Sequence, residues 1–90
     1  MCTYLTEKFA LEGSGKGARG WFRLNEGTVY VDHPVHAPYG HTVNIDFRNP
    51  DLGASARVAL ELTEEDALAL ADAIVAAVKS APAGLASRNQ

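Results

Sequence analysis

Cysteine is almost missing from this 90-residue chain, in which Cys2 is the single example. One cysteine cannot form an intramolecular disulfide, so the fold has to be stabilised by packing, and a reducing compartment is expected. Cationic residues are also scarce. Eight Lys and Arg stand against eleven Asp and Glu, which gives a formal net charge of -3. This balance argues against a nucleic-acid partner, because such binding relies on clustered cations that neutralise phosphates.

Long hydrophobic runs are missing too. No apolar stretch approaches the roughly 20 residues that cross a bilayer, and the first residues lack the basic and apolar regions of a signal peptide. We therefore expect a cytoplasmic protein without a membrane partner. Apolar residues make up 47% and charged residues 21% of the chain, which is typical of a globular protein. The length predicts one domain with a small core over residues 1–80, followed by a flexible tail at 81–90.

The pattern of apolar residues predicts strands followed by a helix. Residues 42–48 and 57–62 alternate polar and apolar side chains, as half-buried strands do. A helix is expected over 64–80, with Thr63 as its N-cap, Asp66 in a capping box and Lys79 in its last turn. Less regular segments complete the pattern: strands at 4–12, 21–25 and 28–32, a flexible glycine-rich loop at 13–20 and a tight turn at Glu26-Gly27. The prediction is an α+β fold, a four- to five-stranded antiparallel meander with one C-terminal helix packed on one face.

Alternation also assigns the faces of this sheet. The apolar face, which the helix should cover, is expected to carry Val29, Val31, Val43, Ile45, Phe47, Val58, Leu60 and Leu62. The polar face is expected to carry Trp21, Arg23, Tyr30, Asp32, Asn44, Asp46, Arg48, Arg57 and Glu61. Such a face is usually a solvated side with cross-strand charge pairs, and otherwise the floor of a pocket or a dimer surface.

The glycine-rich segment contains G-x-G-x-x-G at residues 15–20. A dinucleotide fingerprint has to open a helix, whereas the next element here is a strand, so no nucleotide cofactor is predicted. The segment could still act as a mobile lid in which Lys16 and Arg19 hold a small anionic ligand. Tyr30, Asp46 and Arg57 on the polar face are the other candidate ligand-binding residues. The alternative interpretation is a long hairpin connection without a function.

All three histidines fall within residues 33–41. His33 is in phase with Val31 and His41 with Val43, so the two should lie opposite each other across a hairpin, near enough to share a metal ion. His36 is the candidate third ligand, and zinc is the most suitable divalent transition metal. A fourth ligand or a supporting acceptor could come from Cys2, Tyr30, Asp32 or Asp46. The alternative is that these histidines bond to backbone carbonyls or face water.

The chain resembles an uncharacterised family of short actinobacterial proteins that carry a domain of unknown function. The resemblance covers about residues 1–78 and implies no activity and no catalytic residue. It rests on Met1-Cys2-Thr3, residues 13–17, Arg19-Gly20-Trp21-Phe22, residues 32–38, His41 and residues 44–50.

Two functions remain open from the sequence. The first is a small metal-dependent enzyme of unspecified reaction, with His33, His36 and His41 as ligands and an anionic substrate. The second is a non-catalytic dimeric binding or interaction module that uses the polar sheet face or the alanine-rich flank of the helix. A homodimer is expected because the core is small. The positions of the three imidazoles should discriminate between the two.

Overall fold

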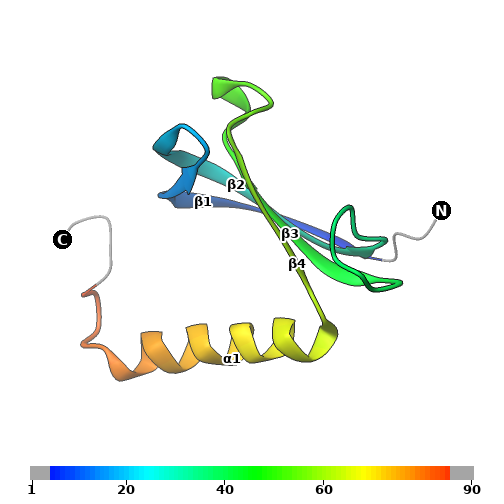
Figure 1. The fold of residues 1–90 in the computed structure, drawn as a ribbon. Coiled ribbons are helices and arrows are strands. Elements are labelled where there is room, and N and C mark those ends of the chain that lie inside the picture. Colours follow the sequence, from blue (N-terminus) through cyan, green and yellow to red (C-terminus); the bar gives the residue numbers. More distant parts are fainter. Residues whose placement is uncertain (1–4, 86–90) are drawn as a thin grey trace.

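The computed structural model describes residues 5–85, which form one antiparallel sheet and one long helix (Figure 1). Each strand pairs with the next one along the chain, so the predicted α+β meander is confirmed with four strands. In chain order the elements are β1 (Thr6–Gly17), β2 (Gly20–Asp32), β3 (Thr42–Arg48), the 3-10 helix η1 (Pro50–Leu52), β4 (Arg57–Leu62) and α1 (Glu64–Ser80).

The strand register confirms the predicted faces. Ile45 on β3 pairs with Val29 on β2 and with Leu60 on β4, which places all three on the apolar face. One residue earlier, Asn44 pairs with Tyr30 and Glu61 on the polar face. The alternation of polar and apolar residues was enough to predict the faces, because a shift of the strand register by one residue would move every side chain to the other face.

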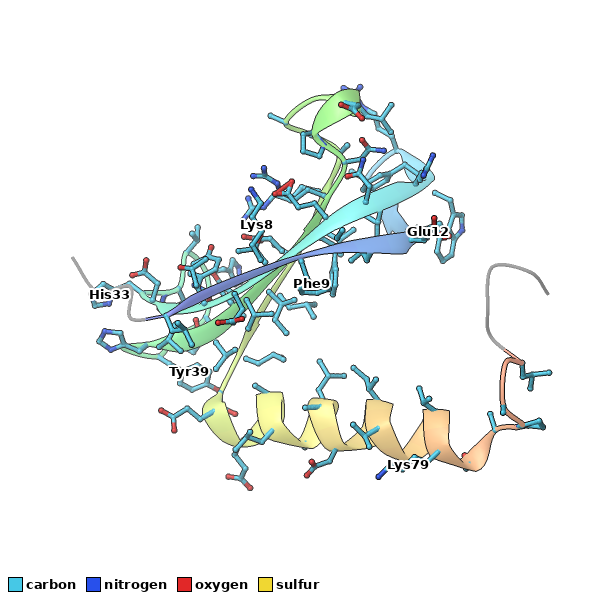
Figure 2. All side chains as sticks on the ribbon, turned by 180° about the vertical axis from the view of Figure 1, so that it is seen from behind. Lys8, Phe9, Glu12, His33, Tyr39 and Lys79 are labelled. Carbon is cyan, nitrogen blue, oxygen red and sulfur yellow. The ribbon has the colours of Figure 1, made fainter. Side chains whose placement is uncertain are left out.

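The helix α1 has the predicted bounds. The Thr63 hydroxyl accepts a hydrogen bond from the Asp66 backbone N–H at 3.2 Å, and three acidic residues occupy the first turn. The helix lies on the side of the sheet toward which Phe9 points, while Lys8 points to the other side (Figure 2).

The packing of α1 is looser than predicted. The helix contacts β3 and β4, yet none of its residues is buried. Only Thr63 separates β4 from α1, and this residue also caps the helix, so the connection sets the direction in which the helix leaves the sheet. The apolar face of the sheet therefore has only partial cover from its own helix.

Two local predictions were wrong. The segment 13–20 is not a flexible loop, because β1 continues to Gly17 and pairs with β2 up to a turn at residues 18–19. Glu26 and Gly27 do not form a turn either, since β2 runs unbroken through both of them. Gly15 and Gly27 lie where a neighbouring side chain comes close to the backbone of the sheet. A β-carbon on Gly15 would lie 2.8 Å from Cδ1 of Leu24, and one on Gly27 would collide with the ring of Phe9.

The remaining segments complete the described chain. Asn49 connects the loop after β3 to β2: its Nδ2 donates to the Arg23 carbonyl at 3.1 Å, and its Oδ1 accepts from Asn25 and from the Asp51 backbone. After α1, Leu85 N–H donates to the Pro82 carbonyl at 3.1 Å, so the first part of the predicted tail forms a turn. Within residues 5–85, no helix has the length and apolar character needed to cross a membrane.

Candidate functional site

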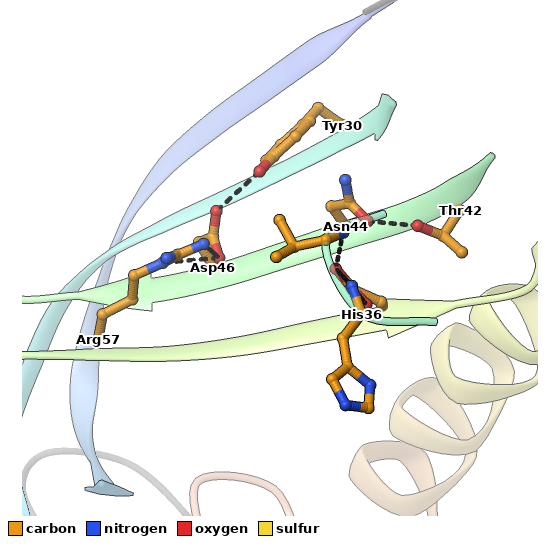
Figure 3. Close-up of polar contacts among 8 residues, drawn as sticks. Tyr30, His36, Thr42, Asn44, Asp46 and Arg57 are labelled. Atoms are coloured by element: carbon orange, nitrogen blue, oxygen red, sulfur yellow. Dashed lines mark hydrogen bonds and ion pairs between the residues drawn. The ribbon is translucent and has the colours of Figure 1, made fainter. Parts of the chain in front are cut away.

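The polar face of the sheet contains a connected group built from three strands (Figure 3). Asp46 on β3 is buried, and its Oδ1 accepts from Nε and Nη2 of Arg57 at 3.1 and 2.8 Å. Its Oδ2 accepts from the hydroxyl of Tyr30 at 3.1 Å. Partial burial, followed by the nearby Asp46 carboxylate, raises the pKa of Tyr30. The structure thus brings together three of the predicted ligand-binding residues and holds the Arg57 guanidinium in a fixed orientation.

A hollow of about 430 Å³ adjoins this group. Arg48 on β3 pairs directly with Arg57 on β4, and both side chains line the hollow. Like charges directly opposite each other destabilise a sheet, so the pair needs compensating charge. The hollow is completed by Asp46, Pro50, Gly53, Ala54 and Ala56.

The positive charge of Arg48 is less closely paired with a carboxylate than that of Arg57. Arg48 Nη2 lies 3.7 Å from Oε2 of Glu26, whereas Lys8 Nζ lies 2.8 Å from Oε1 of the same carboxylate. Lys8 is the main cause of the lowered pKa of Glu26. Nearly half of the Arg48 side chain is exposed, so its guanidinium is accessible to a ligand in the hollow. Arg48 was placed on the polar face from the sequence but was not recognised as a binding residue.

The predicted lid does not close over this hollow. Lys16 lies near the end of β1, and Arg19 lies in the β1–β2 turn. Arg19 lines a different hollow with Trp21, Leu52 and Ser55. These two cations are therefore not part of the group around Asp46.

The loop between β2 and β3 is fastened to the polar face by Glu61. The Glu61 carboxylate accepts hydrogen bonds from three consecutive backbone N–H groups, those of Val35, His36 and Ala37, the last at 2.8 Å. The bonds from Ala37 and then Val35 are the main reason that the pKa of Glu61 is lowered. Successive backbone N–H groups commonly bind anions, and here a side chain of the same chain occupies them. Nothing in the sequence indicates this contact, because it joins residues about 25 positions apart.

The histidines are only partly brought together. The rings of His33 and His41 have centroids 4.4 Å apart and are tilted by 31°, so their predicted opposition is confirmed. Nδ1 of His33 donates to the Gly40 carbonyl at 2.8 Å. The imidazole of His36 points away from Asn44 and Thr42 (Figure 3), and within residues 5–85 no three His, Cys, Asp or Glu side chains are grouped to hold a metal ion. The three-histidine site is thus reduced to a pair, and Cys2 lies outside the described residues.

The chain belongs to DUF6295, a family of unknown function, whose family model matches residues 1–87. This match confirms the resemblance seen in the sequence and leaves an actinobacterial source as an expectation. No curated protein and no solved structure matches the chain.

Proposed function

We propose that this member of the DUF6295 family is a non-catalytic binding module that takes a small anionic ligand on the polar face of its sheet. The observation that carries the proposal is the direct pairing of Arg48 with Arg57 at the edge of one hollow. Guanidinium groups bind carboxylate and phosphate groups through parallel hydrogen bonds. An anion that bridges the two arginines would also relieve the repulsion between them.

Binding fits the hollow better than catalysis does. Asp46 is the one carboxylate among the described residues that line it, and both of its oxygens already accept hydrogen bonds. A carboxylate engaged in this way is poorly placed to take a proton from a substrate. Its role is to orient Arg57 toward the ligand.

Calorimetric titration with inorganic phosphate and, separately, with succinate tests this proposal at low ionic strength. We expect saturable binding of at least one anion, weakened about tenfold or more in Arg48→Gln, because a hydrogen bond to a charged group contributes about 1.5–3 kcal/mol. Lys16→Gln removes the same charge outside the hollow and serves as the matched control. The absence of saturable binding, or an equal loss in both variants, would rule out this site.

A second candidate function is metal binding by His33 and His41, favoured by the close approach of their rings. With two protein ligands, such a site would leave the other coordination positions to water or substrate. His36 is not part of it.

A further inference from the structure

On β3, the polar face of the sheet is better covered than the apolar face, although apolar side chains gain more from burial. On β3, the polar residues Thr42, Asn44 and Asp46 are buried, with exposed fractions of 2%, 6% and 8%. Of their apolar neighbours, Ile45 is 8% exposed, whereas Val43 and Phe47 are only half-buried. The loop that Glu61 holds covers the polar face next to the β2–β3 connection, and Asp46 is in contact with Tyr30 and Arg57. Much of the apolar face is left open.

The helix α1 shows the same imbalance. After its acidic first turn it carries only two charged residues, Asp72 and Lys79, and it is otherwise almost entirely aliphatic. A helix that is apolar on all sides is normally buried. Here its large side chains are exposed, with 68% for Leu68, 55% for Ile74 and 69% for Val78.

The dimensions of the chain agree with these observations. Its accessible surface is 6893 Å², whereas a compact monomer of 9.6 kDa would expose about 5,100 Å². Its radius of gyration is 14.5 Å, against about 12 Å for a compact domain of this length. The excess surface is therefore about 1,800 Å² per chain. Counted for both chains of a dimer, this excess lies in the range of total surface that permanent dimers bury.

The core of a single chain is also small. Within residues 5–85, the buried apolar residues are Leu24, Ile45 and Ala56. So few buried side chains leave little to offset the conformational entropy of the chain. A partner that covers the apolar sheet face and the helix would enlarge this core.

We propose that this partner is a second copy of the chain, and that α1 of each copy covers the apolar sheet face of the other. Each copy offers both a helix and a sheet face, so a two-fold axis satisfies both surfaces at once and closes the assembly. Beyond its acidic first turn the helix carries one charge of each sign, Asp72 and Lys79, so this part of α1 can meet a second chain of net charge -3 without direct repulsion. The short connection through Thr63 holds α1 away from its own sheet and leaves room for the partner's helix.

This arrangement leaves the Arg48–Arg57 hollow on the outer, polar side of each sheet. The dimer therefore does not depend on the proposed anion site. A failure to bind anions and a failure to dimerise would be separate results.

Sedimentation equilibrium over micromolar to near-millimolar concentrations tests the dimer. We expect a single mass of twice 9.6 kDa for the natural sequence. Ile74→Glu should shift the equilibrium to the monomer. Leu52→Glu is the matched control, because Leu52 on η1 is 56% exposed and Ile74 is 55% exposed, and only Ile74 lies in the proposed interface.

Because folding and association are coupled, Ile74→Glu could abolish folding. The melting temperature of the natural sequence then shows whether the chain is a dimer, since it rises with protein concentration for a dimer and is constant for a monomer.

Isotope-filtered NOEs in a mixed-label dimer test the position of the helix. They should connect the methyl groups of Ile74 and Val78 in one chain to the ring of Phe9 in the other. A species of 9.6 kDa with a radius of gyration near 12 Å would mean that α1 folds onto its own sheet and would overturn the proposal, as would an undiminished dimer in Ile74→Glu.

Discussion

The aromatic ring of Phe9 lies against the α-carbon of Gly27 on the neighbouring strand, at a position where a β-carbon would collide with it. The two residues pair directly across the β1–β2 ladder. Glycine weakens a strand because it adds no side chain to the sheet, and an aromatic residue on the adjacent strand restores the missing contact. Gly27 is thus explained by Phe9.

Gly27→Ala should displace the ring and destabilise the fold by about 1–3 kcal/mol, as overpacking does. In a Phe9→Ala background the same change should cost nothing or stabilise slightly, because alanine restricts the unfolded chain more than glycine does. Urea unfolding of the four proteins in this double-mutant cycle measures the coupling. Equal effects of Gly27→Ala in both backgrounds would contradict the contact.

Glu61→Gln should loosen the loop that carries the histidines. The amide retains an oxygen acceptor but loses the charge that strengthens three backbone hydrogen bonds, so the melting temperature should fall. Hydrogen exchange at residues 35–37 should accelerate more than exchange in β3. Asp51→Asn is the control, since Asp51 is an exposed carboxylate on η1, outside both the loop and the proposed interface, and its removal should change neither quantity.

Stability should fall as the pH drops below about 4.5. The pKa values of Glu26 and Glu61 are both lowered in the folded chain from an ordinary value of 4.5. The unfolded chain therefore takes up protons first as the pH falls, and the stability contributed by both carboxylates is complete above about pH 4.5 and declines progressively below it. Unfolding measured from pH 6 to pH 3 should show this decline, with a shallower slope in Glu61→Gln. Identical slopes in the two proteins would show that Glu61 does not contribute.

The sequence predicted the fold best where a local pattern of residues determines the structure. Alternation in residues 42–48 located β3 and its two faces, and Thr63 with Asp66 located the start of α1. Glycine was misleading because its low intrinsic preference for strands was given more weight than its ability to let other groups approach. Gly17, for example, leaves space for the ring of Phe22, which a β-carbon would meet at 3.0 Å.

Long-range contacts could not be obtained from periodicity. The hydrogen bonds from residues 35–37 to Glu61 depend on how the β2–β3 loop folds back over the sheet. The same loop places His36, which forms no metal-binding group of three with the other described side chains. The pairing of Arg48 with Arg57 depends on the register between β3 and β4, which the turn at residues 49–56 sets. Each of these features combines residues whose local sequence gives no sign of the other.

Leu60→Ala tests whether the apolar face is covered in solution. Leu60 is half-buried in the single chain, next to Ile45. If a second copy covers this face, the substitution should cost about 2–5 kcal/mol, as it does in a packed core. Leu52→Ala, at an exposed position, should cost about 0.5 kcal/mol or less. A loss below roughly 0.5 kcal/mol for Leu60→Ala in chemical unfolding would place Leu60 outside any core.

Zinc binding is expected at the His33–His41 pair. The Gly40 carbonyl can only accept a hydrogen bond, so Nδ1 of His33 carries the proton and Nε2 retains the lone pair that a metal requires. Calorimetric titration of tag-free, metal-free protein at pH 7.5 should show binding that is tenfold or more weaker in His33→Ala/His41→Ala and unchanged in His36→Ala. Zinc should raise the melting temperature, and binding should weaken as the pH falls because a protonated imidazole cannot be a ligand. If zinc, copper and nickel each bind the natural chain no more tightly than the double variant, the pair is not a metal site. Anion binding would then be the one remaining proposed function.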